Sequence, residues 1–346
     1  MSSSSSQLLS FQWQLLSPQP DPEHGTPCTR SSHGLSFINN RLVIYGGEHV
    51  ARTPLSEEQA LWVCHDNGQQ WHCVTPSQQP PPRIAHAQAV YQNDIYIFGG
   101  RAGITMQEQA MNDLWKLDCS GLPGLEVWEQ VKDMQGTIPP ARSFHRMICV
   151  GDALYVFGGC GVAGRLQDLY RYDIPTKTWS ECPVAQLAGR GGPNFVPLQG
   201  GRCLLAVAGF CGHETNDAQV YSVEDEQWLE QGVMTLSEMR PRSVCVAGSF
   251  PSMGVVVIFG GEVDPSDRGH EGAGGFANDL VILDELTGEY RETIPATEND
   301  WPETRGWSAG DVHQNALYVF GGLSGDDASP RRLDDLWKLE LVRRDE

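Results

Sequence analysis

A glycine-rich segment of this 346-residue chain, residues 262–276, gathers residue types that bind metal ions. Carboxylate oxygens combined with one imidazole suit a first-row divalent ion, and a site that keeps open coordination positions suits Fe(II). Two interpretations stay open at this point, a metal-binding loop and a solvated acidic loop. The four carboxylates and the imidazole belong to Glu262, Asp264, Asp267, Glu271 and His270.

Two arginines are candidates for binding an anionic group. Arg101 directly follows Gly99-Gly100, and Arg165 follows another glycine. A guanidinium can hold a sulfate, phosphate or carboxylate through two parallel hydrogen bonds. The alternative is that one or both arginines pair with the acidic loop or cap a neighbouring structural unit.

A sequence repeat must position these candidates. Six short apolar runs each end in two small residues, and the steps between the first small residues are 53, 59, 50, 52 and 61. A repeat of about 50 residues that is built from short strands is typical of a kelch-type β-propeller. We therefore predict an all-β, six-bladed kelch β-propeller over residues 11–346, a single domain that follows a disordered tail of residues 1–10. The first small residues are Gly46, Gly99, Gly158, Ala208, Gly260 and Gly321.

Each unit shows the same order of residues around its Gly pair. An Arg starts the first strand, an Asp leads the third strand, and an aromatic residue marks the last one, while the fourth unit is degenerate around Arg190. Each buried ring between blades contributes about 2–3 kcal/mol. Too few residues follow residue 339 for a last strand, so we predict that residues 11–15, which include Trp13, complete the sixth blade and remove a free edge. The arginines are Arg30, Arg83, Arg142, Arg242 and Arg305, and the aromatics are Trp71, Trp128, Trp179, Trp228 and Tyr290.

Composition excludes some classes of function. A net charge of −20 argues against unspecific nucleic-acid binding, which requires a basic surface. We expect no membrane span, because no apolar run reaches about 18 residues, and no secretory signal in the serine-rich start. The ten cysteines contain no C-x-x-C pair, so we expect reduced thiols in the cytoplasm or the nucleus, with a Cys64–Cys73 disulfide as a minor alternative.

Propeller geometry predicts where a site lies. The first strand of each blade starts on one face of the disc and the second strand returns to it, so the Arg-led starts and the residues after Gly-Gly share that face. We call it the loop face. Phe144, His145 and Trp307 lie near the starts of inner strands and are candidates to line a site there, although aromatic residues at such positions usually belong to the core.

The acidic loop and several other segments resemble the plant specifier proteins, a kelch family that includes epithiospecifier, nitrile-specifier and thiocyanate-forming proteins. The resemblance rests on residues 259–274, Arg101, residues 142–145, Arg165-Leu166 and residues 301–307, and it covers nearly the whole propeller. It implies Fe(II)-dependent conversion of a glucosinolate aglucone toward nitrile-type products. By similarity, Glu262 and His270 bind iron, Arg101 and Arg165 hold the sulfate, and Phe144 and Trp307 shape the side-chain pocket.

The chain departs from the family pattern Glu-x-x-x-Asp-x-x-x-His at its middle position. Ser266 stands there, and Asp267 follows one residue later, with Asp264 as a further candidate. A hydroxyl is a poor iron ligand beside a carboxylate. Either the loop shifts its register so that Asp267 completes the set Glu262, Asp267 and His270, or the ion binds weakly or not at all.

Two functions from different classes therefore remain. The first is a specifier-like, Fe(II)-dependent protein that acts on a glucosinolate-type aglucone or a related anionic small molecule. The second is a non-catalytic kelch scaffold that presents its loop face to a protein partner. A glycosidase with two carboxylates is disfavoured, because Asp264 and Asp267 lie too close together in one flexible loop to keep the separation that such chemistry requires.

Overall fold

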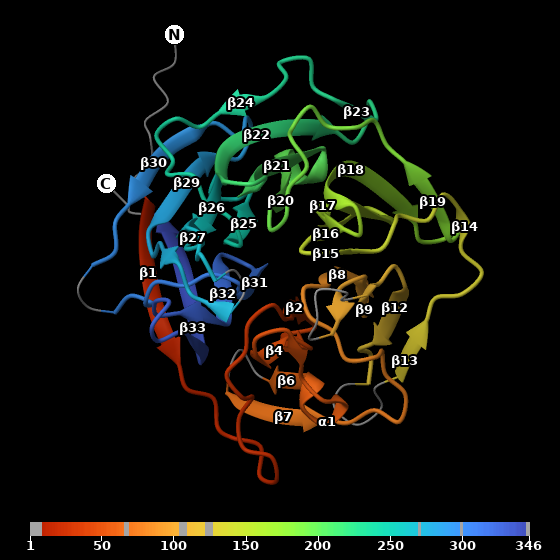
Figure 1. The fold of residues 1–346 in the computed structure, drawn as a ribbon, viewed down its shortest axis with the longest axis vertical. Helices are drawn as coiled ribbons and strands as arrows, with labels where there is room; N and C mark the ends of the chain where they lie inside the picture. The colour runs from red at the N-terminus through yellow and green to blue at the C-terminus, as the bar shows by residue number, and fades with distance from the viewer. Residues whose placement is uncertain are drawn as a thin grey trace.

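The repeat folds into a ring of six blades in the computed structural model, which describes residues 9–65, 69–103, 109–121, 127–268, 271–297 and 300–343. Figure 1 looks down the axis of this ring, and the blades follow one another around it in chain order. The prediction of an all-β, six-bladed propeller is confirmed. The helical segments of the described chain are α1 (Glu57–Ala60) and the 3-10 turn η1 (Gln199–Gly201), and neither is long enough to cross a membrane.

Each blade has four main antiparallel strands, and in the first five blades the chain runs from the axis outward. From inner to outer, the strands are β2 (Gly34–Ile38), β3 (Arg41–Tyr45), β6 (Leu61–His65) and β7 (Gln70–Val74) in blade 1; β8 (Ala87–Tyr91), β9 (Asp94–Phe98), β12 (Leu114–Asp118) and β13 (Val127–Gln130) in blade 2; β16 (Arg146–Val150), β17 (Ala153–Gly161), β18 (Gly164–Asp173) and β19 (Thr178–Glu181) in blade 3; β20 (Asn194–Leu198), β21 (Cys203–Phe210), β22 (Glu214–Ser222) and β23 (Gln227–Trp228) in blade 4; β25 (Val246–Phe250), β26 (Val255–Phe259), β29 (Leu280–Asp284) and β30 (Tyr290–Ile294) in blade 5; and β31 (Ala309–His313), β32 (Ala316–Ser324), β33 (Arg331–Arg343) and β1 (Leu9–Leu16) in blade 6.

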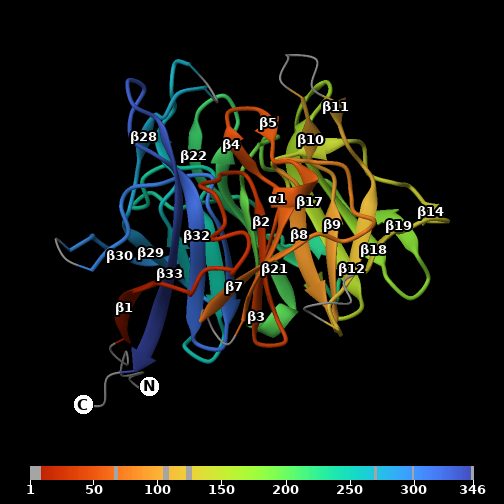
Figure 2. The same cartoon turned by 90° about the horizontal axis from the view of Figure 1, so that it is seen from below.

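Short strands extend the blades. Three two-stranded ladders project from the loop face, where Figure 2 shows most of their labels together at one edge of the disc. The ladders are β4 (Glu48–Val50) with β5 (Thr53–Pro54), β10 (Arg101–Ala102) with β11 (Gln109–Ala110), and β27 (Glu262–Asp264) with β28 (Gly275–Phe276). The other additions are β14 (Gln135–Gly136) beside β19, β15 (Arg142–Ser143) beside β17, and β24 (Met234–Thr235) beside β22.

The N-terminal strand closes the ring, as predicted. β1 pairs antiparallel with β33, so that Trp13 lies opposite Leu339, and it begins at Leu9, two residues before the predicted start. The Trp13 ring packs 4.7 Å from the ring of Phe259 in blade 5. Because the two ends of the chain share one sheet, opening the ring requires breaking that sheet.

Apolar side chains fill the spaces between blades. One core cluster joins Val43 and Leu61 of blade 1 to Ile97 and Trp128 of blade 2, and similar clusters join the other neighbours. The predicted gap-filling rings of Trp71, Trp128 and Trp179 are buried, whereas Trp228 and Tyr290 are half-buried. All ten cysteines, which all lie in the described chain, are free, so no disulfide contributes to this packing.

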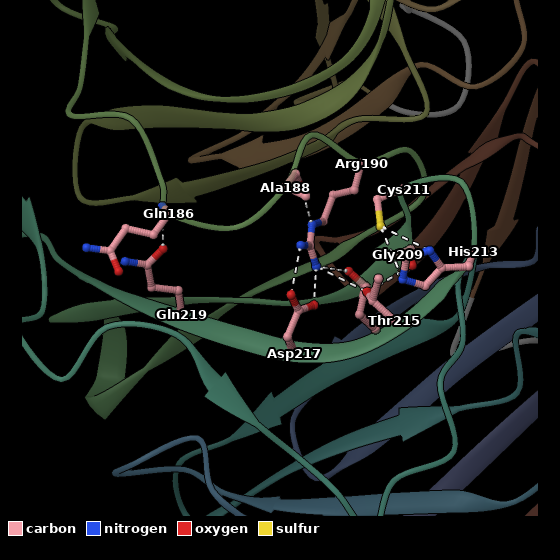
Figure 3. A network of polar contacts seen from close by, with 10 residues as sticks. Gln186, Ala188, Arg190, Gly209, Cys211, His213, Thr215, Asp217 and Gln219 are labelled. Atoms are coloured by element: carbon pink, nitrogen blue, oxygen red, sulfur yellow. Dashed lines mark hydrogen bonds and ion pairs between the residues drawn. The ribbon is translucent and has the colours of Figure 1, made fainter.

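A buried arginine fastens each blade near the loop face. In five blades the guanidinium bonds both the carbonyl after the second strand and the Asp that leads the third strand. Figure 3 shows the pair of blade 4, in which Arg190 lies 2.6 Å from Asp217. The same guanidinium donates to the carbonyl of Ala208 over 3.1 Å. The fourth unit is thus degenerate in sequence but complete in its contacts. The pairs are Arg83–Asp113, Arg142–Asp168, Arg190–Asp217, Arg242–Asp279 and Arg305–Asp335.

A closed ring of six backbone hydrogen bonds surrounds the axis at the loop face. The residue two positions after each motif arginine donates its N–H to the carbonyl of the equivalent residue in the preceding blade, over 2.8–3.1 Å. All six residues have a positive φ, near +50° to +60°, which orients N–H and C=O around the ring. The members, in order, are Ser32, Ala85, Phe144, Gly192, Val244 and Trp307, and the last bonds back to the first through Ser32 N–H and Trp307 O.

Candidate functional site

The loop face is organised by the residue that follows each Gly pair. In every blade this residue forms a backbone bridge with the residue after the motif arginine, so the predicted sharing of one face is confirmed. The side chains at these positions differ in charge from blade to blade. They are Glu48, Arg101, Cys160, Phe210, Glu262 and Leu323, in order from blade 1 to blade 6.

Arg101 and Phe144 lie together, although they come from different blades. Arg101 starts β10 in blade 2, and its guanidinium carbon lies 5.0 Å from the centre of the Phe144 ring in blade 3. Phe144 is a member of the backbone ring, so its position is set by two hydrogen bonds, one to Ala85 and one from Gly192. The Phe144 ring thus lies against the Arg101 cation, an arrangement that favours attraction between the positive charge and the aromatic face.

Arg165 is placed in the same manner one blade further on. Its guanidinium carbon lies 4.5 Å from the centre of the Phe210 ring of blade 4. Among the described residues, no carboxylate lies within ion-pair distance of Arg165, so the alternative that it pairs with the acidic loop is not realised there. Burial raises the pKa of the Cys160 thiol, and the charges of Arg165 and Arg101 oppose that rise. Arg165 lies opposite Cys160 in the β17–β18 ladder, and Cys160 pairs with Ser143, the neighbour of the Phe144 that carries Arg101. Cys160 therefore lies between the two arginines on the loop face.

Two buried carboxyl groups lie on the same face, in blades 4 and 5. Glu214 begins β22 and Glu262 begins β27, and both side chains are less than a tenth exposed. Burial and then the neighbouring Glu262 raise the pKa of Glu214 to about 8, although the charge of Arg165 lowers it. Burial and then Asp327 raise the pKa of Glu262 to about 7, although a backbone hydrogen bond from Ser266 lowers it. Near neutral pH the site therefore holds carboxyl groups that exchange protons.

The acidic loop is held by three contacts with its surroundings. The Ser266 hydroxyl donates to Asp327 of the β32–β33 hairpin over 2.5 Å, and the Arg268 guanidinium donates to the carbonyl of the same residue over 2.6 Å. Asp264 forms an exposed ion pair of 2.8 Å with Arg240. Ser266, at the position where the family pattern has Asp, thus joins the loop to blade 6.

The described residues do not complete an iron site. Glu262 is buried at the site, Asp267 is exposed to solvent, and His270 lies outside the described residues. In the described part of the chain, no three His, Cys, Asp or Glu side chains are grouped so that they could hold a metal ion. Among the described residues, Glu262 is the one predicted ligand that lies buried at the site, and no chemical step is derived through Fe(II).

The remaining aromatic candidates separate into two groups. Trp307, a member of the backbone ring, packs edge-on against Phe276, with 5.8 Å between ring centres, and Phe276 lies opposite Glu262 in the β27–β28 ladder. His145 is instead buried against Phe98 and belongs to the core between blades 2 and 3. Trp307 and Phe144 thus lie beside the charged residues, and His145 does not.

Three neighbours of the predicted residues were not foreseen from the sequence. Cys160 and Phe210 follow their Gly pairs, as Arg101 and Glu262 do, so the position rule alone was a usable signal for them. Glu214 carries no such signal, because it starts a return strand and becomes part of the site only through the packing of blade 4 on blade 5.

Comparison with known proteins places these features in a family. A family model described as the KLHDC2/KLHL20/DRC7 Kelch-repeats domain matches residues 32–261. A solved structure, that of YjhT, superposes with a TM-score of 0.68 at 16% identity over 92% of this chain and 96% of that one. At that identity, the likeness to YjhT supports the fold alone.

Curated relatives fall into two kinds. N-(sulfonatooxy)prop-2-enimidothioate sulfolyase of Thlaspi arvense is 26% identical over 328 residues, which cover 86% of this chain and 89% of that protein. Host cell factor 2 of Homo sapiens is 29% identical over 164 residues, but these are 19% of its length, and the match to Adagio protein 3 of Arabidopsis thaliana covers 39% of that protein. The chain is thus similar to one relative over nearly its full length and to others over a part.

Proposed function

The chain belongs to the KLHDC2/KLHL20/DRC7 kelch-repeat family, and from this premise we propose that its loop face binds a small anionic molecule and directs its breakdown, as a specifier-like protein does. The observation that carries the proposal is the placement of Arg101 and Arg165 on either side of Cys160, each against an aromatic ring. Two guanidinium groups around one centre suit a sulfate or another multi-oxygen anion.

The substrate class follows from the full-length relative. That protein is named as a sulfolyase of N-(sulfonatooxy)prop-2-enimidothioate, whose sulfate ester matches the chemistry of the two arginines. We extend the proposal to a glucosinolate-type aglucone that is converted to nitrile-type products. In this arrangement Arg101 and Arg165 hold the sulfate, while Phe144 and Trp307 contact the apolar part of the substrate. Positioning the leaving group in this way can favour one breakdown route over another.

Fe(II) is a separate element of the proposal. Glu262, Asp267 and His270 are its candidate ligands, and Fe(II) would supply a Lewis acid or a soft partner for sulfur. Support comes from the buried Glu262 carboxyl at the edge of the site. An anaerobic Fe(II) titration of the metal-free protein tests this element separately, with Glu262→Ala as the control.

The experiment that tests the main proposal is product analysis with N-(sulfonatooxy)prop-2-enimidothioate generated in solution, with and without the protein and Fe(II). We expect the protein to shift the products from isothiocyanate toward a nitrile or a related sulfur-loss product. Arg101→Met with Arg165→Met should abolish the shift, whereas Arg171→Met, which removes an arginine paired with Asp173 further along β18, should retain it. Products identical to those of the spontaneous reaction would refute the proposal.

A second candidate function is a protein-binding scaffold, and one observation favours it. Two valines at hairpin tips of the loop face are exposed, Val162 to 93% and Val50 to 59%. Exposed apolar tips suit contact with a protein better than contact with a small anion. A specific partner that is retained by the Arg101→Met, Arg165→Met variant but lost from Val50→Asp with Val162→Asp would establish this function.

A further inference from the structure

A cavity of about 400 Å³ lies along the axis of the propeller, separate from the loop-face residues described above. The inner strands of all six blades line it. At the loop face it is bounded by the backbone ring, where a smaller cavity of about 30 Å³ is lined by ring members and by Arg146. Arg146 therefore lies at the end of the axial cavity, next to the ring.

Arg146 crosses the axis to reach two other blades. It starts β16 in blade 3, yet its Nε donates to the carbonyl of Pro193 in blade 4 over 2.9 Å, and Nη2 donates to the carbonyl of Cys245 in blade 5 over 2.8 Å. A guanidinium has five N–H donors. Three of them, two on Nη1 and one on Nη2, are not used in these bonds.

The charge of Arg146 lacks the compensation that the motif arginines have. Within the described residues, no Asp or Glu lies within ion-pair distance of it, whereas Arg83 is 2.7 Å from Asp113. Burial lowers the pKa of Arg146, which reflects the cost of a desolvated cation. The acidic residue of the cavity wall, Asp311, uses its oxygens to accept the N–H groups of Phe37 and Val312, each over 2.8 Å.

A second donor lines the same cavity beside Arg146. Asn194 starts the inner strand of the next blade and is 2% exposed. Among the described residues, its Nδ2 has no hydrogen-bond partner apart from the weakly accepting thiol of Cys245 beside it. A buried amide donor without a good acceptor costs free energy unless a ligand or water supplies one. The rest of the lining mixes apolar side chains, among them Ala89, Val196 and Val312, with polar ones such as Gln88 and Ser249.

We propose that the axial cavity binds a small organic carboxylate, whose oxygens accept the remaining N–H groups of Arg146 and the Nδ2 group of Asn194, and whose short apolar chain extends along the cavity. The anion supplies the counter-charge that the described residues leave out, and the chain occupies the apolar part of the lining. This site is independent of the loop-face site, because the backbone ring lies between them.

Butyrate is the probe that tests this proposal, with n-butanol as the uncharged control, at constant ionic strength. We expect butyrate to bind the full-length protein saturably by calorimetry and to raise its unfolding temperature, because a ligand that binds only the folded state stabilises it. Arg146→Met should weaken this binding at least about tenfold, since charge-assisted hydrogen bonds are lost. Arg165→Met, on the loop face, should bind butyrate as the wild type does.

Asn194→Asp provides a test that does not depend on removing Arg146. The nearly isosteric change places a carboxylate beside the guanidinium, so we expect this variant to unfold at a higher temperature than the wild type without ligand and to lose the response to butyrate. Saturable binding that both variants lose supports the proposal. It is overturned if the wild type shows no saturable binding, if n-butanol binds equally well, or if all variants respond alike.

Discussion

The motif arginines and the loop-face arginines show how one residue type serves two purposes in this propeller. Arg83 is fully buried and shares two hydrogen bonds with Asp113 of its own blade. Arg165 is exposed and lies on the ring of Phe210 from the next blade. The first type is neutralised within its repeat unit, whereas the second keeps its charge available to a ligand.

This difference indicates how binding residues can be recognised in a repeat protein. A cation that carries its own carboxylate in the same unit recurs with the repeat and serves the fold. A cation that departs from the repeat and has an aromatic neighbour varies from blade to blade and suits binding. The comparison predicts that replacing arginine by methionine lowers stability at a motif position and lowers ligand affinity at a loop-face position.

The largest effect is expected from Arg83→Met. The substitution leaves the Asp113 carboxylate without its partner and removes a hydrogen bond to the carbonyl of Gly99. Burial raises the pKa of Asp113, but the hydrogen bonds and charge of Arg83 outweigh burial and hold that pKa below its usual value. Breaking such a buried pair costs about 3–5 kcal/mol. Urea unfolding measures this loss, and a cost below about 1 kcal/mol would contradict the structural role.

A smaller effect, on binding only, is expected from Arg165→Met. We expect its free energy of unfolding to stay within about 0.5 kcal/mol of the wild type, because an exposed side chain without an ion pair contributes little. Sulfate or substrate-analogue affinity should fall about tenfold, since a charge-assisted contact is lost. Isothermal titration measures the affinity of Arg165→Met and of its control, Arg171→Met, which should bind as the wild type does. Equal losses of affinity in these two variants would contradict a specific role of Arg165 in binding.

The charge balance of the loop face predicts a dependence on pH. The pKa of Glu214 is about 8 in the folded protein, against an ordinary value of 4.5. A folded-state pKa raised in this way means that the folded protein keeps a proton that the unfolded chain has already lost. The stability contribution therefore falls as pH rises from about 4.5 through about 8.

Glu214→Gln should remove that fall, because a neutral amide of the same shape carries no desolvated charge. We expect the variant to be more stable than the wild type by up to a few kcal/mol at pH above 8, because each unit of pKa shift corresponds to about 1.4 kcal/mol, and equal to it near pH 4. Thermal unfolding at the two pH values checks this expectation. A difference that does not vary with pH would show that Glu214 does not titrate as a buried group.

Much of the fold could be predicted from the sequence, since it depends on signals within one unit. The Gly pairs, the leading arginines and the aromatic of residues 11–15 each report on a single blade or its closure. The pairing of each motif arginine with the Asp at the start of the third strand was not predicted, although both residues were identified. Linking them requires knowing that the guanidinium at the start of the first strand extends past the carbonyl of the Gly pair to the third strand, a contact made by folded side chains and not by the strand order.

Less of the candidate site could be predicted, because its contacts cross between blades. Arg101 and Glu262 were found from their position after a Gly pair, but the ring beneath Arg101 comes from another unit. Glu214 and Arg146 were missed altogether, since each acquires its environment only when the neighbouring blades are assembled. The placement of His270 stays untested, because it lies outside the described residues.

Blade 1 offers the finest test of the comparison, because its motif arginine has no Asp. Ala60 occupies the position at which each of the other five blades has its Asp. Arg30 instead donates to the carbonyls of Gly46 and Gln59, both over 3.1 Å, and to the Cys28 sulfur over 3.6 Å. Burial lowers the pKa of Arg30, which the nearby Cys28 thiol partly opposes.

Ala60→Asp would give Arg30 the partner that Arg83 has in Asp113. We expect the free energy of unfolding to change by less than about 1 kcal/mol, because the gain from pairing is nearly cancelled by the cost of burying the new carboxylate. Urea unfolding of this variant beside Arg83→Met compares making a pair with breaking one. A gain of several kcal/mol would mean that the Arg–Asp pairs stabilise the blades outright. The small change expected here would instead show that the carboxylates chiefly prevent the penalty of an unpaired charge, and that Arg30 already avoids this penalty through carbonyl groups.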